Sequence, residues 1–148
     1  MKTFLVPVDF SAVSEVIIDA AATFARAFGG KVFLVHAVQP PIVTSEYALP
    51  ITALEEALAA AEKAATQKLA DYTTAFKKAG LDCTSLVRQG PPVHVITEEA
   101  ARLKADFIVM GSHGHGKFYD LFVGSTASGV LKRAKCGVII LPPVDKTG

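Results

Sequence analysis

Short apolar runs alternate with longer amphipathic segments along the whole of this 148-residue chain. The apolar runs are rich in β-forming residues and are apolar at consecutive positions, which is typical of strands buried on both faces. The segments between them repeat apolar residues at helical spacing. This alternation restricts the chain to an α/β fold, with helices on both faces of a mostly parallel sheet. The expected strands are residues 3–9, 31–38, 83–89, 107–110 and 138–142.

The connections between these strands limit the order in which they pair. Because a crossover between parallel strands is almost always right-handed, few orders are available. We predict a single domain over residues 1–148, built on a doubly wound, five-stranded parallel sheet of order 3-2-1-4-5. The order then reverses between the first and fourth strands, and ligands bind beyond the carboxyl ends of the strands at such a reversal. The two strand ends that meet there read PVDFS (7–11) and MGSHG (110–114).

Polar residues indicate where the first two helices begin. Ser11 stands where a side chain would cap the first helix, which runs until Gly29. Thr52 and Glu55 have the T-x-x-E spacing of a capping box for the second helix, which runs until Gly80. We therefore expect a side-chain cap at the start of each of these helices.

The composition excludes several classes of protein. With 51% hydrophobic and 20% charged residues the chain is globular, and its net charge of +1 gives no reason to expect nucleic acid or a polybasic membrane contact. Pro7 and Asp9 interrupt the first apolar run, so it is neither a signal peptide nor a membrane span, and we expect a cytoplasmic protein. Cys83 and Cys136 lie far apart and are expected to be reduced thiols.

The stretch GSHGHGKFYDLFVGSTASG is loose and rich in hydrogen-bonding groups. Gly111 and Gly114 lie just past the fourth strand, while Gly124, Ser125 and Thr126 lie where the fourth helix begins. Glycine lets main-chain N–H groups point into a concavity, and a helix start adds unpaired N–H groups and partial positive charge. The stretch therefore predicts an anion site, for phosphate above all.

The glycine spacing, G-x-x-G, nine residues, then G-[ST], resembles the ATP-binding signature of the universal stress protein family. The resemblance extends over the whole chain: PVDFS, LVHAV, a Gly-Pro entry to the third helix, ADFIVMGSHG and VIILP occur in the family's order. The chain is similar to the small single-domain bacterial and archaeal form. The resemblance implies an adenine nucleotide alpha hydrolase-like fold.

The resemblance also implies which residues contact the base and the ribose. Asp9 would lie beside the nucleotide, with Pro7 and Val8 leading into it. The main chain of Ala37 would hydrogen-bond adenine. The residues implied near the ribose are Met110 and Gly111.

The phosphates would be held by the glycine stretch and the helix start that follows it. The residues implied there are His113, Gly114, Gly124, Ser125 and Thr126. His113 and His115 form an H-x-H pair, but two histidines without a third ligand fall short of a zinc site, so a phosphate contact or solvation is the simpler interpretation. Asp9 has two interpretations: it binds the ribose or a Mg²⁺ ion, or it only caps the helix that opens near Ser11.

The function that the resemblance implies is that of a dimeric, ATP-binding stress-response module with little or no turnover. Its ligands would be ATP, or AMP or ADP, and Mg²⁺. The chain has neither a nucleophile–base pair nor two carboxylates spaced for acid–base work, so we expect at most weak ATP hydrolysis. Two alternatives stay open: a slow Mg²⁺-dependent ATPase, and a nucleotide-free dimer that binds other proteins.

The last strand suggests how a dimer would form. Residues 138–142, VIILP, would lie at the sheet edge with apolar side chains, and such an edge can pair with another chain. In the family the fifth strands pair across a two-fold axis, so the resemblance implies a homodimer through Val138–Pro142. Pro142 and Pro143 would keep that pairing short.

Overall fold

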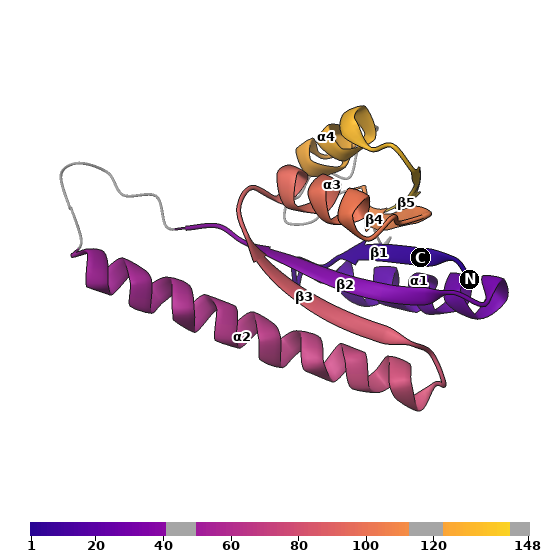
Figure 1. Cartoon of the computed structure of the whole chain (residues 1–148), viewed down its shortest axis with the longest axis horizontal. Coiled ribbons are helices and arrows are strands. Elements are labelled where there is room, and N and C mark those ends of the chain that lie inside the picture. The colour runs from indigo at the N-terminus through magenta and orange to yellow at the C-terminus, as the bar shows by residue number, and fades with distance from the viewer. Residues whose placement is uncertain (41–49, 113–122, 143–148) are drawn as a thin grey trace, which may run out of the picture.

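The computed structural model describes residues 1–40, 50–112 and 123–142. In chain order its elements are β1 (Thr3–Pro7), α1 (Ser14–Phe28), β2 (Lys31–Val38), α2 (Ile51–Lys78), β3 (Cys83–Gln89), α3 (Pro92–Arg102), β4 (Phe107–Gly111), α4 (Ser125–Arg133) and β5 (Gly137–Leu141). The strands form one parallel sheet of order β3-β2-β1-β4-β5 (Figure 1), which confirms the predicted fold class and strand order.

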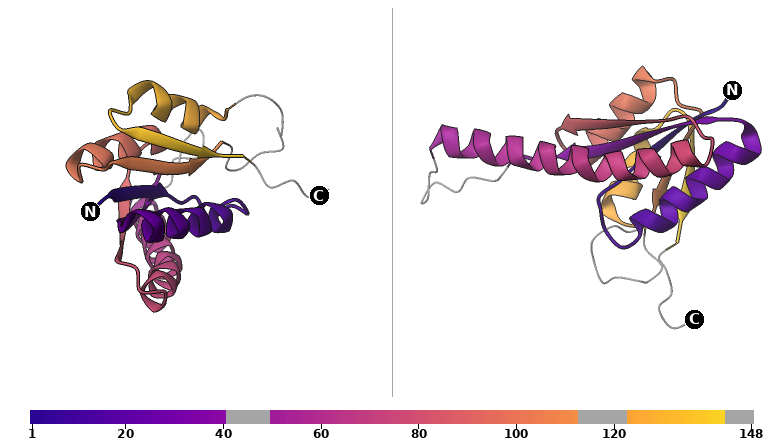
Figure 2. Two further views of the ribbon diagram at one scale, coloured as in Figure 1. Left: turned by 90° about the vertical axis from the view of Figure 1, so that its right-hand side faces the viewer. Right: turned by 90° about the horizontal axis from the view of Figure 1, so that it is seen from below.

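The sheet separates two layers of helices, each with its own apolar core. Helices α1 and α2 cover one face, and α3 and α4 cover the other (Figure 2). Successive side chains of a strand point to opposite faces, so Phe4 and Val6 of β1 join the core under α1 and α2, while Leu5 joins the core under α3 and α4. All three side chains are fully buried, which accounts for the continuous apolar run in the sequence.

The central strand, β1, ends before its two neighbours do. β1 ends at Pro7, which lies opposite Val35, whereas β2 continues to Val38. On its other side β1 pairs with β4 only as far as Leu5, since Pro7 has no N–H to donate to a ladder, and β4 continues to Gly111. The carboxyl ends of β2 and β4 therefore have no strand between them.

The predicted start of the first helix is wrong. α1 begins at Ser14, its N-cap is Val13, and no side chain caps it. Ser11 lies three residues earlier, in a turn that follows Phe10, whose φ of 62° is in the left-handed region. This conformation turns the chain after β1, so the helix cannot begin directly after Ser11.

The predicted capping box of the second helix is also wrong. α2 begins at Ile51 with Pro50 as its N-cap, and no side chain caps it. The carbonyl oxygen of Pro50 accepts the N–H groups of Ala53 and Leu54 at 2.9 and 3.2 Å. Proline sets φ near the helical value and favours an early start, which places Thr52 inside the first turn.

Helices α3 and α4 approach each other closely at a glycine. A Cβ atom built on Gly129 of α4 would lie 2.7 Å from Cγ2 of Val93 on α3. Contacts this short do not occur between real side chains, and a valine methyl group has little freedom to move aside. The absence of a side chain at Gly129 therefore sets the spacing of the two helices.

This spacing gives a testable prediction for Gly129→Ala. Alanine should gain up to about 1 kcal/mol of helix propensity, but overpacking against Val93 should cost about 1–3 kcal/mol, so we expect a net loss of stability of about 1 kcal/mol in urea unfolding. In a Val93→Ala background the same substitution should stabilise the protein by about 0.5–1 kcal/mol, because the opposing methyl groups are gone. Equal effects in both backgrounds would contradict this account.

Candidate functional site

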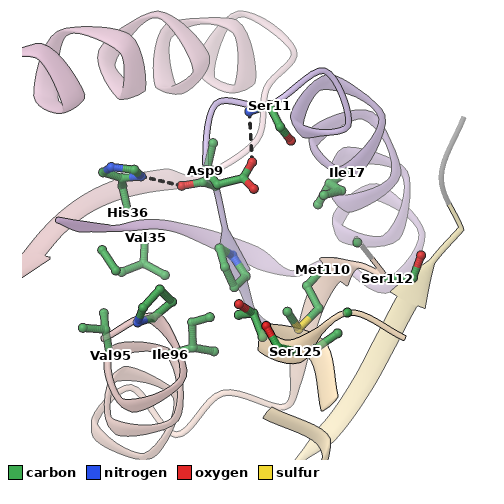
Figure 3. Close-up of a pocket in the computed structure, with 18 of the residues that line it drawn as sticks. Asp9, Ser11, Ile17, Val35, His36, Val95, Ile96, Met110, Ser112 and Ser125 are labelled. Carbon is green, nitrogen blue, oxygen red and sulfur yellow. Dashed lines mark hydrogen bonds between the residues drawn. The ribbon is translucent and has the colours of Figure 1, made fainter. Parts of the chain in front are cut away.

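A cavity of about 420 Å³ opens where the carboxyl ends of β1, β2 and β4 meet (Figure 3). It lies at the reversal of strand order, where the sequence predicts a ligand. Nine of the predicted site residues line it: Pro7, Val8, Asp9, Ala37, Met110, Gly111, Gly124, Ser125 and Thr126. The other two, His113 and Gly114, lie outside the residues that the structure describes, as does His115.

Ten further residues line the cavity, and sequence reasoning did not single them out as site residues. They are Ser11, Ile17, Val35, His36, Gln39, Pro92, Val95, Ile96, Ser112 and Ala127. For two of these residues the sequence did indicate a place near the site, because Val35 and His36 lie near the end of a predicted strand next to the reversal of strand order. Nothing in the sequence indicated that α3 lines the cavity, since its apolar residues look like ordinary core positions.

The two ends of the cavity differ in chemistry. Val35 of β2 lies near Val95 and Ile96 of α3, and together they form an apolar wall (Figure 3). Ser112 and Ser125 lie at the other end, where β4 ends and α4 begins (Figure 3). An apolar wall suits a flat ring, and hydroxyl and N–H groups at a helix start suit an anion.

Asp9 lies at the cavity wall in the turn between β1 and α1. Its Oδ1 atom accepts the main-chain N–H of Ser11 at 2.9 Å and the hydroxyl of Ser14 at 3.2 Å. The interpretation that Asp9 caps the helix is wrong, because Val13 is the N-cap of α1 and no side chain caps that helix; Asp9 instead supports the turn before it. These two bonds fix the carboxylate at the mouth of the cavity, where it can also meet a ligand.

The start of α4 is tied to the end of β4 by main-chain hydrogen bonds. The N–H of Gly124 donates to the carbonyl oxygen of Ser112 at 2.7 Å, and the N–H of Ser112 donates to that of Leu141 on β5 at 2.8 Å. Gly124 is the N-cap of α4, and no side chain caps the helix. Among the residues that the structure describes, no side chain caps these first-turn N–H groups, which lie at the cavity wall.

A buried carboxylate, Glu99, ties α3, and thereby the apolar wall, to Arg88 of the sheet. Glu99 of α3 is 6% exposed and accepts hydrogen bonds from Nε of Arg88 on β3 at 2.9 Å and from Nε and Nη2 of Arg102 at 2.9 and 2.6 Å. Burial raises the pKa of Glu99, but the hydrogen bonds from Arg102 and Arg88 together lower it more, so it lies below its usual value.

The described part of the chain shows neither a dense group of metal-binding side chains nor a membrane-spanning helix. Between residues 1 and 142, leaving out 41–49 and 113–122, no three or more His, Cys, Asp or Glu side chains gather to hold a metal ion. None of the helices there combines the length and apolar character needed to cross a bilayer.

Comparison with known proteins links this geometry to one family. The Universal stress protein family model matches residues 1–142. A protein of Thermus aquaticus, the "Universal stress protein in QAH/OAS sulfhydrylase 3'region", is 32% identical over 142 residues, which cover 95% of this chain and 98% of that protein. The structure of universal stress protein UspA from Lactobacillus plantarum has a TM-score of 0.81 at 26% identity, with 95% and 97% of the two chains covered. A universal stress protein in complex with cAMP has a TM-score of 0.64 at 26% identity, with 95% of each chain covered.

The Glu99 cluster gives a prediction for the pH dependence of stability. Since the pKa of Glu99 is lower in the folded chain, its contribution is present above its usual value of 4.5 and is lost as the pH falls through the lowered value. Glu99→Gln should cost about 1.5–3 kcal/mol at pH 7, with a deficit that shrinks below pH 4.5. Urea unfolding at pH 7 and below pH 4.5 measures this loss of stability.

The neighbouring glutamate provides the control. Glu98 forms an exposed pair with His94 and is 66% exposed, so Glu98→Gln should change stability by less than about 0.5 kcal/mol at either pH. A Glu99→Gln deficit that is the same at pH 7 and at low pH would show that the loss comes from packing and not from ionisation.

Proposed function

The chain belongs to the universal stress protein family and has its adenine nucleotide alpha hydrolase-like fold, and from this premise we propose that it binds an adenine nucleotide in the cavity between β2 and β4. ATP is the proposed ligand, with AMP or ADP as the shorter forms. The protein would act in the cytoplasm as a stress-response module that signals by binding, with little or no turnover.

One observation carries the proposal: a helix start without a side-chain cap faces one end of a cavity whose other end is apolar. The partial positive charge and the first-turn N–H groups of α4 suit phosphate oxygens, with Ser125 and Thr126 as further donors. The wall of Val35, Val95 and Ile96 suits the faces of a purine ring. The universal stress protein solved with cAMP supports an adenine nucleotide as the ligand.

Asp9 is the proposed protein ligand of Mg²⁺. Mg²⁺ in nucleotide sites is commonly held by one or two carboxylates together with phosphate oxygens, and it keeps several waters. A single carboxylate at the mouth of the cavity fits that requirement, and the described residues supply no dense cluster that would hold the ion alone. The metal would neutralise phosphate charge beside the carboxylate.

A slow Mg²⁺-dependent ATPase is the second candidate. Asp9, with Mg²⁺, is the group that could orient a water molecule toward a phosphate. Turnover that rises above background and is lost in Asp9→Ala would favour this candidate. Turnover that persists in Asp9→Ala would exclude this mechanism.

Ser125 offers a variant that separates nucleotide binding from folding. In Ser125→Asp a carboxylate at the first position of α4 suits the helix dipole, so stability should hold or rise by about 0.3–1 kcal/mol. The same charge should repel phosphate and weaken ATP binding roughly tenfold to a hundredfold in calorimetry. Ser125→Asn, which has a similar shape and no charge, should keep most of the affinity. Unchanged ATP affinity in Ser125→Asp would place the phosphates elsewhere.

We also propose that two copies pair through β5. It is an edge strand whose four apolar side chains, Val138 to Leu141, are only partly buried, as expected of a surface that another chain completes. Because Leu141 directs its carbonyl toward β4, the alternation of a strand directs the N–H of Ile140 outward. The proposed pairing extends over residues 138–142.

Ile140→Pro tests this pairing. Proline removes the outward N–H without removing a bond to β4, so the variant should sediment as a monomer where the parent chain sediments as a dimer. Ile140→Val keeps the N–H and should remain a dimer. A monomeric parent chain, or a dimer that survives the proline, would contradict pairing through β5.

A further inference from the structure

The main chain of β2 points alternately to its two neighbours. Toward β1, the N–H of Lys31 donates to the Lys2 carbonyl oxygen, and the Val35 carbonyl oxygen accepts the N–H of Val8, each at 2.8 Å. Odd-numbered residues of β2 thus face β1, and by this alternation Ala37 faces the same side. There β1 has already ended, so the N–H and carbonyl groups of Ala37 face the cavity that this residue lines.

The even-numbered residues of β2 confirm the alternation. The N–H of Val32 donates to the carbonyl oxygen of Asp82 at 2.9 Å, and the carbonyl oxygen of Val38 accepts the N–H of Gly90 at 3.0 Å. Both bonds lead to the β3 side of the sheet. The main-chain groups of Ala37 are therefore directed away from β3.

A regular ladder would use the Ala37 N–H in its next hydrogen bond, to the carbonyl oxygen of Val8. In the structure the carbonyl oxygen of Val8 is instead hydrogen-bonded to the side chain of His36, whose Nδ1 atom lies 2.6 Å from it. A carbonyl oxygen only accepts, so Nδ1 carries the proton. The pairing of β1 with β2 ends at Pro7 and Val35, one position short of this bond.

The imidazole of His36 also packs against the ring of Phe10. The two ring centroids are 4.5 Å apart, and Nζ of Lys68 on α2 lies 4.9 Å from the Phe10 ring centre. Phe10 has a left-handed backbone with φ of 62°, directly after Asp9 and beyond the end of β1. The turn and the imidazole together keep β1 from continuing beside Ala37.

We propose that His36 is a positioning residue for base recognition, because it takes the Val8 carbonyl oxygen and so reserves the N–H and carbonyl groups of Ala37 for the nucleotide. This inference rests on the proposed function. One edge of adenine carries a hydrogen-bond acceptor, N1, beside a donor, the N6 amino group. A main-chain N–H and carbonyl that face the same side can meet both.

The variants separate the hydrogen bond of His36 from its bulk. His36→Phe keeps an aromatic ring against Phe10 but has no donor, whereas the side-chain amide of His36→Asn can donate from nearly the position of Nδ1. His94→Phe changes an exposed histidine of α3, 71% exposed, and is the control.

The first readout needs no nucleotide. In the parent chain without ligand, the Ala37 amide should exchange its hydrogen rapidly; in His36→Phe the released Val8 carbonyl should accept it and slow exchange at least tenfold. His36→Asn and His94→Phe should behave like the parent chain. Equal Ala37 exchange in the parent chain and His36→Phe would overturn the inference.

The second readout is binding, with inorganic triphosphate as a probe that lacks a base. His36→Phe should weaken ATP binding about tenfold, as expected for the loss of one to two hydrogen bonds, and leave triphosphate binding unchanged. His36→Asn should restore ATP binding. An equal loss for both probes would overturn the role in base recognition. A parent chain that binds neither probe would refute the proposed function, while the Ala37 exchange would still test the end of the ladder.

Discussion

The site of this protein depends on a mismatch of strand lengths at the centre of the sheet. β2 extends three residues beyond the level of Pro7, roughly 10 Å at about 3.3 Å per residue, and β4 extends past the last residue of β1 that pairs with it. A parallel sheet normally satisfies its main-chain groups between neighbouring strands. Where the middle strand stops early, those groups become available to something else, and helices from both layers close the space around them.

The two helical layers have different roles around this space. α1 supplies one wall and holds the turn of Asp9 through Ser14. α3 and α4 supply the apolar and the anion-binding ends, and the contact of Gly129 with Val93 and the ionic cluster around Glu99 set where these helices lie. The polar side chains that line the cavity are those of Asp9, His36 and Gln39 and the hydroxyl groups of Ser11, Ser112, Ser125 and Thr126, all of which can bind and orient a ligand.

The fold and most of the site could be predicted from the sequence, because the spacing of apolar residues reflects which faces of a strand or helix are buried. Consecutive apolar residues at Phe4, Leu5 and Val6 record a strand covered on both faces, and the alternation of elements with right-handed crossovers leads to the strand order. The predicted starts of the first two helices were wrong because backbone conformation sets them. The left-handed backbone of Phe10 delays the start of α1, and Pro50 starts α2 before Thr52. The role of His36 was not predictable, since it depends on a hydrogen bond across two strands.

The left-handed backbone of Phe10 has a consequence for how the chain could vary. Glycine adopts this conformation without strain, whereas for an aromatic residue it costs about 1–2 kcal/mol. The contacts of the Phe10 ring with His36 and Lys68 must therefore offset this cost in stability. Replacing Phe10 by glycine would ease the turn but remove the ring that both Lys68 of α2 and His36 of β2 contact, so this strained residue connects the outer helix layer to a strand that lines the cavity.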